Sequence, residues 1–316
     1  MVWVYYGLLG AVTWCVTTPQ DTRRELWEQV RSWLSANLRA KALIGTSTVL
    51  LILALLAWGN LPDGRLHVFF LDVGQGDAIF LQTPAGRQVL IDGGPSPSVL
   101  LSQLGRRMPF WDRSLDLVVL THPDADHING LVPVLERYEV DAVVFREMGC
   151  TRPACEQWRQ LVEEEVVAVY RGEAGLEIEL DEGLRLTVLH PGADFLTDEG
   201  FNANSLVMQL TYGQATVLLT GDIQASVERH LLVNGVSLMS HVLKVAHHGS
   251  CDSTTQAFLD AVDPELVVIS VGVDNEFDHP CDALVERLSD RRLYRTDKHG
   301  TVALTTDGQR WWVKTE

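Results

Sequence analysis

The sequence has little positive charge. Its 316 residues hold 25 Lys and Arg against 42 Asp and Glu, which gives a formal net charge of -17. This balance excludes a broad basic surface for duplex DNA, because such binding depends on Lys and Arg neutralising phosphates. An acidic chain instead suits a pocket that concentrates divalent cations.

Cysteine is also scarce, with five in the chain. No spacing among them matches a zinc finger, which excludes a structural zinc of that kind. Cys15 lies in an apolar segment, and the other four make two candidate pairs, Cys150 with Cys155 and Cys251 with Cys281. An oxidising compartment would allow both pairs to form disulfides; four unlinked thiols are the alternative.

Long apolar runs are confined to the first 60 residues. Two runs, at about 2–18 and 42–58, reach the lower length limit for crossing a bilayer, and we expect N-terminal transmembrane helices there. The first lacks the basic start of a cleavable signal peptide and could also be interfacial or the remnant of a longer membrane region. For the second, a buried core helix in a soluble protein is the alternative.

The segment between the two runs is rich in basic residues. It contains five of them: Arg23, Arg24, Arg31, Arg39 and Lys41. The positive-inside rule places this segment in the cytoplasm, so the second span would carry the chain outward. We therefore expect a membrane region at 1–60 and an extracytoplasmic domain at 61–316. The latter holds 20 basic and 39 acidic residues, so the acidity belongs to it.

The segment 61–316 alternates short apolar runs with turn residues. Its hydrophobic patterning predicts strands at 66–73, 78–83, 88–91, 117–120, 142–145, 166–170, 184–189, 205–212, 215–220, 242–246, 266–270, 301–305 and 310–313. Helices are predicted at 154–164, 223–233, 254–262 and 282–290. Two Gly-rich corners, DVGQGD at 72–77 and DGGP at 92–95, let the backbone approach a ligand or another chain. This order of elements predicts an α/β fold of two sheets with helices outside.

The most informative stretch is 117–131, LVVLTHPDADHINGL. The apolar start predicts a buried strand, and Pro123 favours a strand end at the residue before it. Four metal-competent side chains follow: His122, Asp124, Asp126 and His127. A helix is expected next, with an inner face of Ile128, Leu131 and Val134. A helix-capping turn would need one Asp rather than two Asp and two His, so we interpret the stretch as a metal site for hydrolysis.

Two further predicted strands end in residues of the same kind. The strand at 215–220 leads to Asp222, and the strand at 242–246 leads to His247 and His248. Each of these residues has an alternative explanation when it is considered alone. Asp222 would be the N-cap of the next helix, and His247 and His248 would be a hydrogen-bonded pair in the core. Three strand ends of this type together predict a shared rim that holds metal ions.

Five segments of the chain match the motifs of a known protein family, and they occur in the same order as in that family. They are HVFFLDVGQGDAIFL, LTHPDADHINGL, NANSLVMQLTYGQATVLLTGDI, VLKVAHHGS and RTDKHGTVAL. Together they resemble the C-terminal metallo-β-lactamase-like domain of ComEC-type DNA internalisation (competence) proteins. The resemblance runs from about Leu66 to the end of the chain. It implies an αββα metallo-β-lactamase-like sandwich, and the N-terminal spans look like the tail of the family's membrane channel.

The resemblance also implies two divalent metal ions at one edge of the sandwich. His122 and Asp124 would face the first ion. Three residues would hold the second ion, namely Asp126, His127 and His247, and Asp222 would bridge both. The general pattern of the fold has His where this chain has Asp124, and a third His where this chain offers Asn202, Asn204 and Ser205. The first site is therefore richer in oxygen, which makes Mn²⁺ a candidate beside Zn²⁺.

Further roles follow from this assignment. Two cations would activate a bridging water and stabilise a pentacoordinate phosphorus, with Asp126 orienting the nucleophile. His248 and Lys298 are candidate catalytic residues, and Asn204, Ser250 and His279 are candidate substrate contacts. Each of three residues also has a simpler explanation. His248 would support the metal ligands without touching substrate, His279 would be an ordinary loop residue, and Lys298 would be a solvated surface charge.

The resemblance implies a membrane-anchored nuclease (a phosphodiesterase) that degrades one DNA strand during uptake in natural transformation. We expect single-stranded DNA, the membrane and a separate DNA channel protein as partners. A hydrolase of the same fold that acts on a non-DNA phosphodiester or a lactam is the first alternative, which the acidity favours. A module whose metals only hold the fold is the second.

Overall fold

The computed structural model describes residues 14, 17–36, 38–59, 61–166, 168–193, 195 and 200–316. Internal contacts divide the chain into two units, Met1–Leu61 and Pro62–Glu316. Each unit is described by itself. The first expected membrane span, at about 2–18, lies almost wholly outside the described residues.

The described part of the first unit includes the helices α2 (Gln20–Ala36) and α3 (Leu38–Gly59). The second apolar run, at 42–58, lies within α3. Large apolar side chains of α3 are exposed, among them Leu43, Val49 and Leu51. By length and apolar content together, none of the helices among the described residues qualifies as a membrane span. The expected transmembrane helices are therefore not confirmed.

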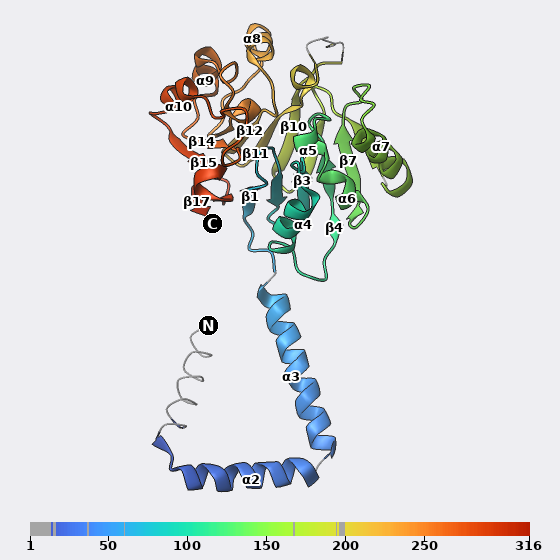
Figure 1. Ribbon diagram of the computed structural model, residues 1–316, viewed down its shortest axis with the longest axis vertical. Helices are drawn as coiled ribbons and strands as arrows, with labels where there is room; N and C mark the ends of the chain where they lie inside the picture. The colour runs from blue at the N-terminus through green and yellow to red at the C-terminus, as the bar shows by residue number, and fades with distance from the viewer. Residues whose placement is uncertain are drawn as a thin grey trace. The chain divides into compact units, whose positions relative to one another are not determined.

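The second unit is a sandwich of two sheets with helices on both outer faces (Figure 1). The first sheet has the order β17-β16-β1-β2-β3-β5-β7-β8. Its strands are β1 (Leu66–Phe70), β2 (Ile79–Gln82), β3 (Gln88–Ile91), β5 (Leu117–Val119), β7 (Ala142–Phe145), β8 (Ala168–Arg171), β16 (Val302–Thr306) and β17 (Trp311–Thr315). A separate short pair is formed by β4 (Ser114–Leu115) and β6 (Glu139–Val140).

The second sheet has the order β15-β14-β13-β12-β11-β10-β9. Its strands are β9 (Glu177–Asp181), β10 (Leu184–His190), β11 (Val207–Tyr212), β12 (Ala215–Leu219), β13 (Val242–Lys244), β14 (Leu266–Ile269) and β15 (Arg292–Arg295). In each sheet one half is antiparallel and the other is parallel, from β3 to β8 and from β12 to β15. The carboxyl ends of parallel strands share one edge of a sheet, which is where ligand sites form in α/β folds.

Helices and short 3-10 turns connect the strands. They are α4 (Pro97–Gly105), α5 (Ala125–Ile128), α6 (Leu131–Leu135), α7 (Pro153–Glu165), η1 (Asn202–Asn204), α8 (Ala225–Val233), η2 (Ala246–Gly249), α9 (Gln256–Val262), α10 (Asp282–Arg287) and α11 (Thr296–His299). Two of the apolar clusters of the unit pack helices against sheets: one includes Leu104 and Trp158, and the other includes Phe258 and Leu284. The predicted αββα sandwich is thus confirmed.

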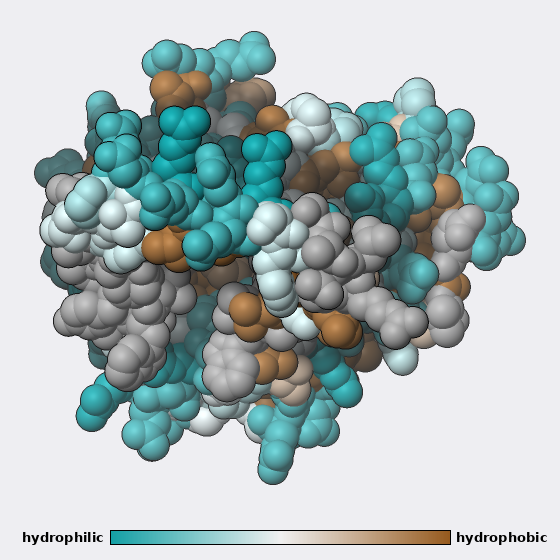
Figure 2. All heavy atoms as spheres, turned by 90° about the horizontal axis from the view of Figure 1, so that it is seen from below, coloured by the Kyte–Doolittle hydropathy of each residue, from teal (hydrophilic) through white to brown (hydrophobic). Residues whose placement is uncertain are grey.

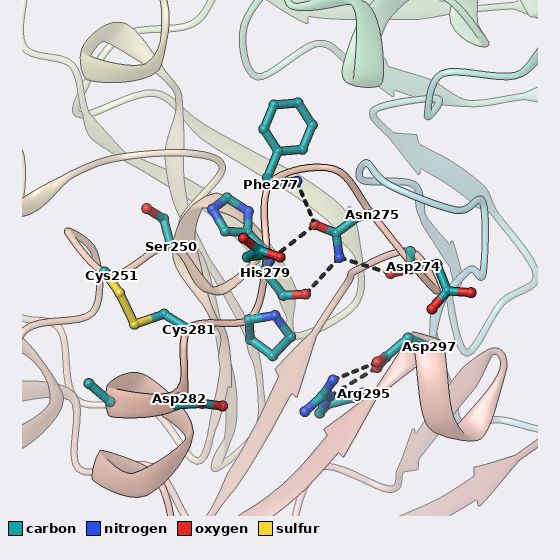
Figure 3. A pocket seen from close by; sticks show the side chains of 14 residues that line it. Ser250, Cys251, Asp274, Asn275, Phe277, His279, Cys281, Asp282, Arg295 and Asp297 are labelled. Carbon is teal, nitrogen blue, oxygen red and sulfur yellow. Dashed lines mark hydrogen bonds and ion pairs between the residues drawn. A yellow bond between two sulfur atoms is a disulfide. The ribbon is translucent and has the colours of Figure 1, made fainter.

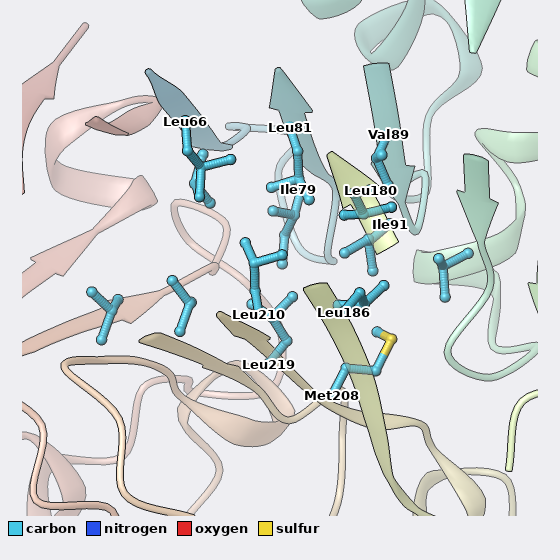
Figure 4. Packing of buried hydrophobic residues seen from close by; sticks show 14 of the residues in the cluster. Leu66, Ile79, Leu81, Val89, Ile91, Leu180, Leu186, Met208, Leu210 and Leu219 are labelled. Carbon is cyan, nitrogen blue, oxygen red and sulfur yellow. The ribbon is translucent and has the colours of Figure 1, made fainter. Parts of the chain in front are cut away.

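A third apolar cluster fills the space between the two sheets (Figure 4). Leu81 and Ile91 of the first sheet lie opposite Leu186 and Leu210 of the second, and all four are buried. The alternation of buried and less buried residues along β10 is the pattern of a strand with one face in a core. Each such Leu or Ile stabilises the fold by about 1.5–3 kcal/mol through removal of its surface from water.

One predicted element differs from the structure. The single helix expected after His122 is two short helices, α5 and α6, which are separated at Asn129 and Gly130. A Cβ on Gly130 would lie 1.9 Å from the carbonyl oxygen of Gly93. The break therefore brings two backbones closer together than any residue with a side chain would permit.

Four strands were not predicted: the short pair β4 and β6, and the strands β9 and β15 at the edges of the second sheet. β9 has the sequence EIELD, and its acids keep one side of an edge strand polar. Figure 2 likewise shows hydrophilic residues over much of the face that it draws, with apolar residues in separate patches. Both features agree with a formal net charge of -17.

Candidate metal centre

Four side chains that follow the ends of three strands converge on one point. Asp126 and His127 lie on α5, which follows β5; Asp222 follows β12; and His248 lies on η2, which follows β13. One ligand atom from each of the four lies within 4.8 Å of the other three. The shared rim predicted from the strand ends is therefore present in the tertiary structure.

The spacing of these atoms fits a metal ion. The Oδ2 atom of Asp222 lies 3.3 Å from Nε2 of His127 and 3.1 Å from Nε2 of His248. The Oδ2 atom of Asp126 lies 3.3 Å from the same Nε2 of His248. Ligands about 2.0 Å from a tetrahedral ion are about 3.3 Å from one another, so these three distances match those between ligands of one ion.

Hydrogen bonds fix which nitrogen of each imidazole faces the centre. The Nδ1 atom of His248 lies 3.0 Å from the carbonyl oxygen of Ser270, which can only accept a proton. The Nδ1 atom of His127 lies 2.8 Å from a carboxylate oxygen of Asp92. Both Nδ1 atoms are therefore donors, and in the neutral imidazole Nε2 carries the lone pair. Both Nε2 atoms are buried without a hydrogen-bond partner among the described residues, as a metal ligand would be.

His122 is oriented through Thr121. The hydroxyl of Thr121 donates to Asp92 at 2.6 Å, so its oxygen is left to accept from Nδ1 of His122 at 3.1 Å. The Nε2 atom of His122 is buried and has no hydrogen-bond partner among the described residues. The His122 and His127 ring centroids are 4.1 Å apart. Three imidazoles thus present Nε2 lone pairs toward the same region.

The charges around the centre favour a cation. Burial would raise the pKa of Asp222, but His248 and His127 outweigh it and hold that pKa well below its ordinary value. Burial would lower the pKa of His127 and of His248, yet Asp222 and the further carboxylates raise both well above the ordinary value. The carboxylates therefore recruit protons onto the imidazoles, and a bound metal ion would take the place of that positive charge.

A second layer of residues supports the cluster. Lys244 is fully buried at the end of β13; its ammonium group donates to the carbonyl of Gly221 at 3.0 Å and contacts Asp77. It also lies 3.6 Å from Oδ1 of Asp222. Burial would raise the pKa of Asp77, but Lys244 lowers it to about 2. Buried charges persist only when paired, so Lys244 stabilises the two carboxylates that flank it.

His122 and Asp124, expected to face a first ion, lie side by side. The Oδ2 atom of Asp124 is 3.5 Å from Nε2 of His122, while its Oδ1 atom pairs with the guanidinium of Arg152 at 2.6 Å. Burial would raise the pKa of Asp124, but the neighbouring His122 and Arg152 side chains lower it to about 2. The carboxylate of Asp124 is thus ionised, with one oxygen near the imidazole of His122 and the other paired with the guanidinium of Arg152.

The structure distinguishes the two adjacent histidines. His247 was assigned to the metal, but the atoms that converge include His248 and not His247. The Nε2 atom of His247 instead lies 3.2 Å from the side-chain amide nitrogen of Asn202. Both histidines have positive φ, 51° and 52°, so the turn of η2 sends their side chains in different directions. Sequence patterning alone does not resolve such a turn.

The remaining predicted site residues lie farther out. The side chain of Asn204 donates to the carbonyl of Gly200 at 2.9 Å, and that of Ser250 donates to Asp252 at 2.6 Å. His279 lies near His247, with ring centroids 5.7 Å apart. Lys298 is exposed on α11, and the described residues that converge on the centre do not include it.

Sequence reasoning missed three buried residues, Asp77, Asp92 and Lys244. Both acids belong to the Gly-rich corners at 72–77 and 92–95, and Asp92 directly follows β3. The signal was therefore the same as for Asp222, an acid after a buried strand. Lys244 interrupts the apolar run of β13, and a lysine inside a buried strand requires a charged partner.

A family model described as the metallo-beta-lactamase superfamily matches residues 71–273. "ComE operon protein 3" of Bacillus subtilis is 31% identical over 254 residues, which are 75% of this chain and 32% of that protein. "Competence protein ComA" of Neisseria gonorrhoeae is 28% identical over 249 residues, 76% of this chain and 32% of that protein. The chain thus spans about a third of the length of these curated relatives.

Solved structures share the fold. The structure of CmlA, described as a diiron beta-hydroxylase from Streptomyces venezuelae, superposes with a TM-score of 0.53. It is 15% identical in sequence, and the match covers 78% of this chain and 55% of CmlA. At this identity the likeness concerns the arrangement of sheets and helices only.

Proposed function

Because the chain belongs to the metallo-beta-lactamase superfamily, we propose that it is a metal-dependent phosphodiesterase that cleaves DNA during DNA uptake. The observation that carries the proposal is the convergence of Asp126, His127, Asp222 and His248, with both imidazole Nε2 atoms directed at the carboxylates. The similarity to proteins named for competence in two bacteria supports DNA as the substrate.

The cluster of Asp126, His127, Asp222 and His248 fits one divalent ion, and we propose a second ion beside His122 and Asp124. A bound divalent ion supplies an activated water and neutralises the charge of a phosphodiester. The oxygen-rich set of three carboxylates suits Mn²⁺ as well as Zn²⁺. His127 is held by Asp92 and His248 by Ser270, so the ligands keep their orientation without substrate.

Asp126 is half-exposed, unlike the other three residues of the cluster. Burial would raise its pKa, but His248 and His127 lower it, so the carboxylate is ionised at neutral pH. It is therefore placed to hold the proton of an attacking water at its carboxylate oxygens. Arg152, paired with Asp124 at 2.6 Å, offers a guanidinium to a non-bridging phosphate oxygen.

We further propose that the protein acts at the cell membrane, with Pro62–Glu316 outside the cytoplasm. The exposed apolar side chains of α3 between Leu43 and Leu53 support contact with lipid. The disulfides Cys150–Cys155 and Cys251–Cys281 support an oxidising compartment. A DNA channel protein is the further partner proposed. Protease access to Pro62–Glu316 in intact cells tests the orientation, and protection from protease would contradict it.

The test of activity uses end-labelled single-stranded oligonucleotides and the purified chain with Mn²⁺ or Zn²⁺. We expect cleavage by the wild type and its loss, by at least about 100-fold, in Asp126→Ala. The matched control is Asp260→Ala, an exposed acid on α9 whose carboxylate accepts a hydrogen bond from Gln256 at 2.7 Å. Metal binding without cleavage of any phosphodiester would contradict the proposal.

A second candidate is a hydrolase of a small phosphodiester or a lactam. The observation that favours it is the acidity of residues 61–316, with 39 acidic against 20 basic residues, because a polyanion is repelled at low salt. Cleavage of a small phosphodiester but not of DNA would identify this activity.

A further inference from the structure

A wide cleft lies beside the metal centre and is lined in part by Ser250 and His279, two of the predicted substrate contacts. It has a volume of about 880 Å³ and is formed by three segments, at 250–251, 272–283 and 295–297. The Cys251–Cys281 disulfide joins two of these segments and forms part of the wall (Figure 3). A cleft of this size is in the range of sites that receive small organic groups.

A row of rings leads from the cleft to the metal centre. The ring of Phe277 is stacked with that of His279, with centroids 5.8 Å apart and planes at 29°. The His279 and His247 centroids are 5.7 Å apart, and those of His247 and His248 are 6.3 Å apart. Three successive centroid distances of 5.8, 5.7 and 6.3 Å thus connect Phe277 with His248, which belongs to the metal centre.

The loop that carries Phe277 is ordered by a single side chain. The amide of Asn275 donates to the carbonyls of Gly272 and His279, at 3.0 and 2.6 Å. Its carbonyl oxygen accepts from the backbone N–H groups of Phe277 and His279, at 3.2 and 3.0 Å. Phe277 is nevertheless 60% exposed. A large aromatic ring held open to solvent by a fixed loop is a preformed stacking surface.

The charge of the cleft excludes phosphate as its occupant. The cleft is lined by four aspartates, Asp274, Asp278, Asp282 and Asp297. Its one arginine, Arg295, is paired with Asp297 at 2.5 Å. A carboxylate accepts hydrogen bonds and repels an anion, so the cleft favours a neutral ring that carries N–H donors. The exocyclic amino groups of adenine, cytosine and guanine are donors of this kind.

We propose that this cleft binds the base of the nucleotide next to the scissile phosphate, with Phe277 stacked on the base and the cleft aspartates accepting from its amino group. The proposal rests on the phosphodiesterase function and deepens it, because it names single-stranded DNA with amino-bearing bases as the preferred substrate. A base in a duplex is already stacked and paired and does not reach the cleft.

The test compares the full chain with its Phe277→Ala and Phe277→Trp variants, in the presence of Mn²⁺. Substrates are homopolymers of dA, dC and dT and an oligonucleotide without bases. We expect KM for dA and dC to rise about ten-fold in Phe277→Ala and to return in Phe277→Trp, since one stacked base contributes that much to binding. We expect kcat to stay within about two-fold, and the wild type to bind dT and the abasic strand more weakly.

The matched control is Phe110→Ala, because Phe110 is 76% exposed and does not line the cleft. A readout independent of turnover is the fluorescence of 2-aminopurine in a dA strand, which stacking on Phe277 quenches and Phe277→Ala restores. Equal KM values for wild type and Phe277→Ala, with equal cleavage of abasic DNA, would overturn the cleft proposal and leave the nuclease intact. Failure of the wild type to cleave any strand would overturn both.

Discussion

Each histidine of the centre has one nitrogen committed to the protein and one directed at the cluster. His248 uses Nδ1 for the carbonyl of Ser270, and His127 uses Nδ1 for Asp92. These partners hold each Nδ1 atom as a donor and leave Nε2 as the nitrogen that faces an ion, which lowers the cost of assembling the ligands. His247 is the opposite case, because its Nε2 atom lies against Asn202.

Because only His248 faces the cluster, we expect substitutions of His248 and His247 to change the affinity for metal to different extents. His248→Ala should weaken Zn²⁺ binding by more than about 100-fold, because it removes a ligand that touches two carboxylates. His247→Ala, the matched control, should stay within about ten-fold of the wild type. Competition titration against a chromophoric chelator measures both affinities. The assignment fails if the His247 variant loses the metal and the His248 variant keeps it.

The buried side chain of His190 should make the free energy of unfolding depend on pH. Burial lowers its pKa to about 4, and its Nε2–H group donates to the carbonyl of Ala203 at 3.0 Å. The unfolded chain, with an ordinary pKa near 6.5, binds the proton more readily. The free energy of unfolding should therefore fall as pH drops from about 6.5 to about 4, by up to about 3 kcal/mol from this group.

The variant His190→Gln removes the titrating group and keeps a donor. Urea unfolding at pH 7 and pH 5, with a chelator present so that metal release adds no second pH dependence, should show a smaller loss of stability for the variant. The same loss in both proteins would mean that His190 does not carry this effect.

At the scale of elements, the centre is assembled from loops that follow strands, and a disulfide reinforces one of them. Cys251–Cys281 joins the segment after η2 to the segment before α10 and closes a loop with a sequence separation of 30. Cys150–Cys155 closes a loop with a separation of 5. The longer loop restricts the unfolded chain more strongly.

Removal of the two disulfides should therefore have different effects. Replacing Cys251 and Cys281 by Ala should lower the free energy of unfolding by about 3–4 kcal/mol, and replacing Cys150 and Cys155 by about 2 kcal/mol. Denaturant unfolding of the two double variants measures the difference. A larger loss for the short loop would show that local packing, rather than chain entropy, determines these contributions.

At the scale of the whole molecule, the negative charge opposes the approach of a polyanion. Raising NaCl from about 10 mM to about 150 mM shortens the screening length from about 30 Å to about 8 Å. KM for single-stranded DNA should therefore fall over this range, while KM for a small phosphodiester, the control, should change little. A steep loss of DNA affinity with salt, typical of basic nucleic-acid binders, would contradict this prediction.

The sequence predicted most of the sandwich, because its strands have strong local signals. Apolar runs such as 88–91 and 142–145 coincide with β3 and β7. The edge strands β9 and β15 were missed because edge positions are partly polar. The break between α5 and α6 was missed because it depends on contact between Gly130 and Gly93, which are 37 positions apart in the chain.

The sequence by itself determined that this chain gathers His and Asp at the ends of buried strands, because strand ends and ligand types are local properties. Only the tertiary structure decided which of two adjacent histidines turns inward, that Asp92 and Lys244 support the cluster, and that a cleft with Phe277 opens beside it. These features depend on the turn of η2 and on contacts across the two sheets, and pairings between distant segments leave no local pattern in the chain.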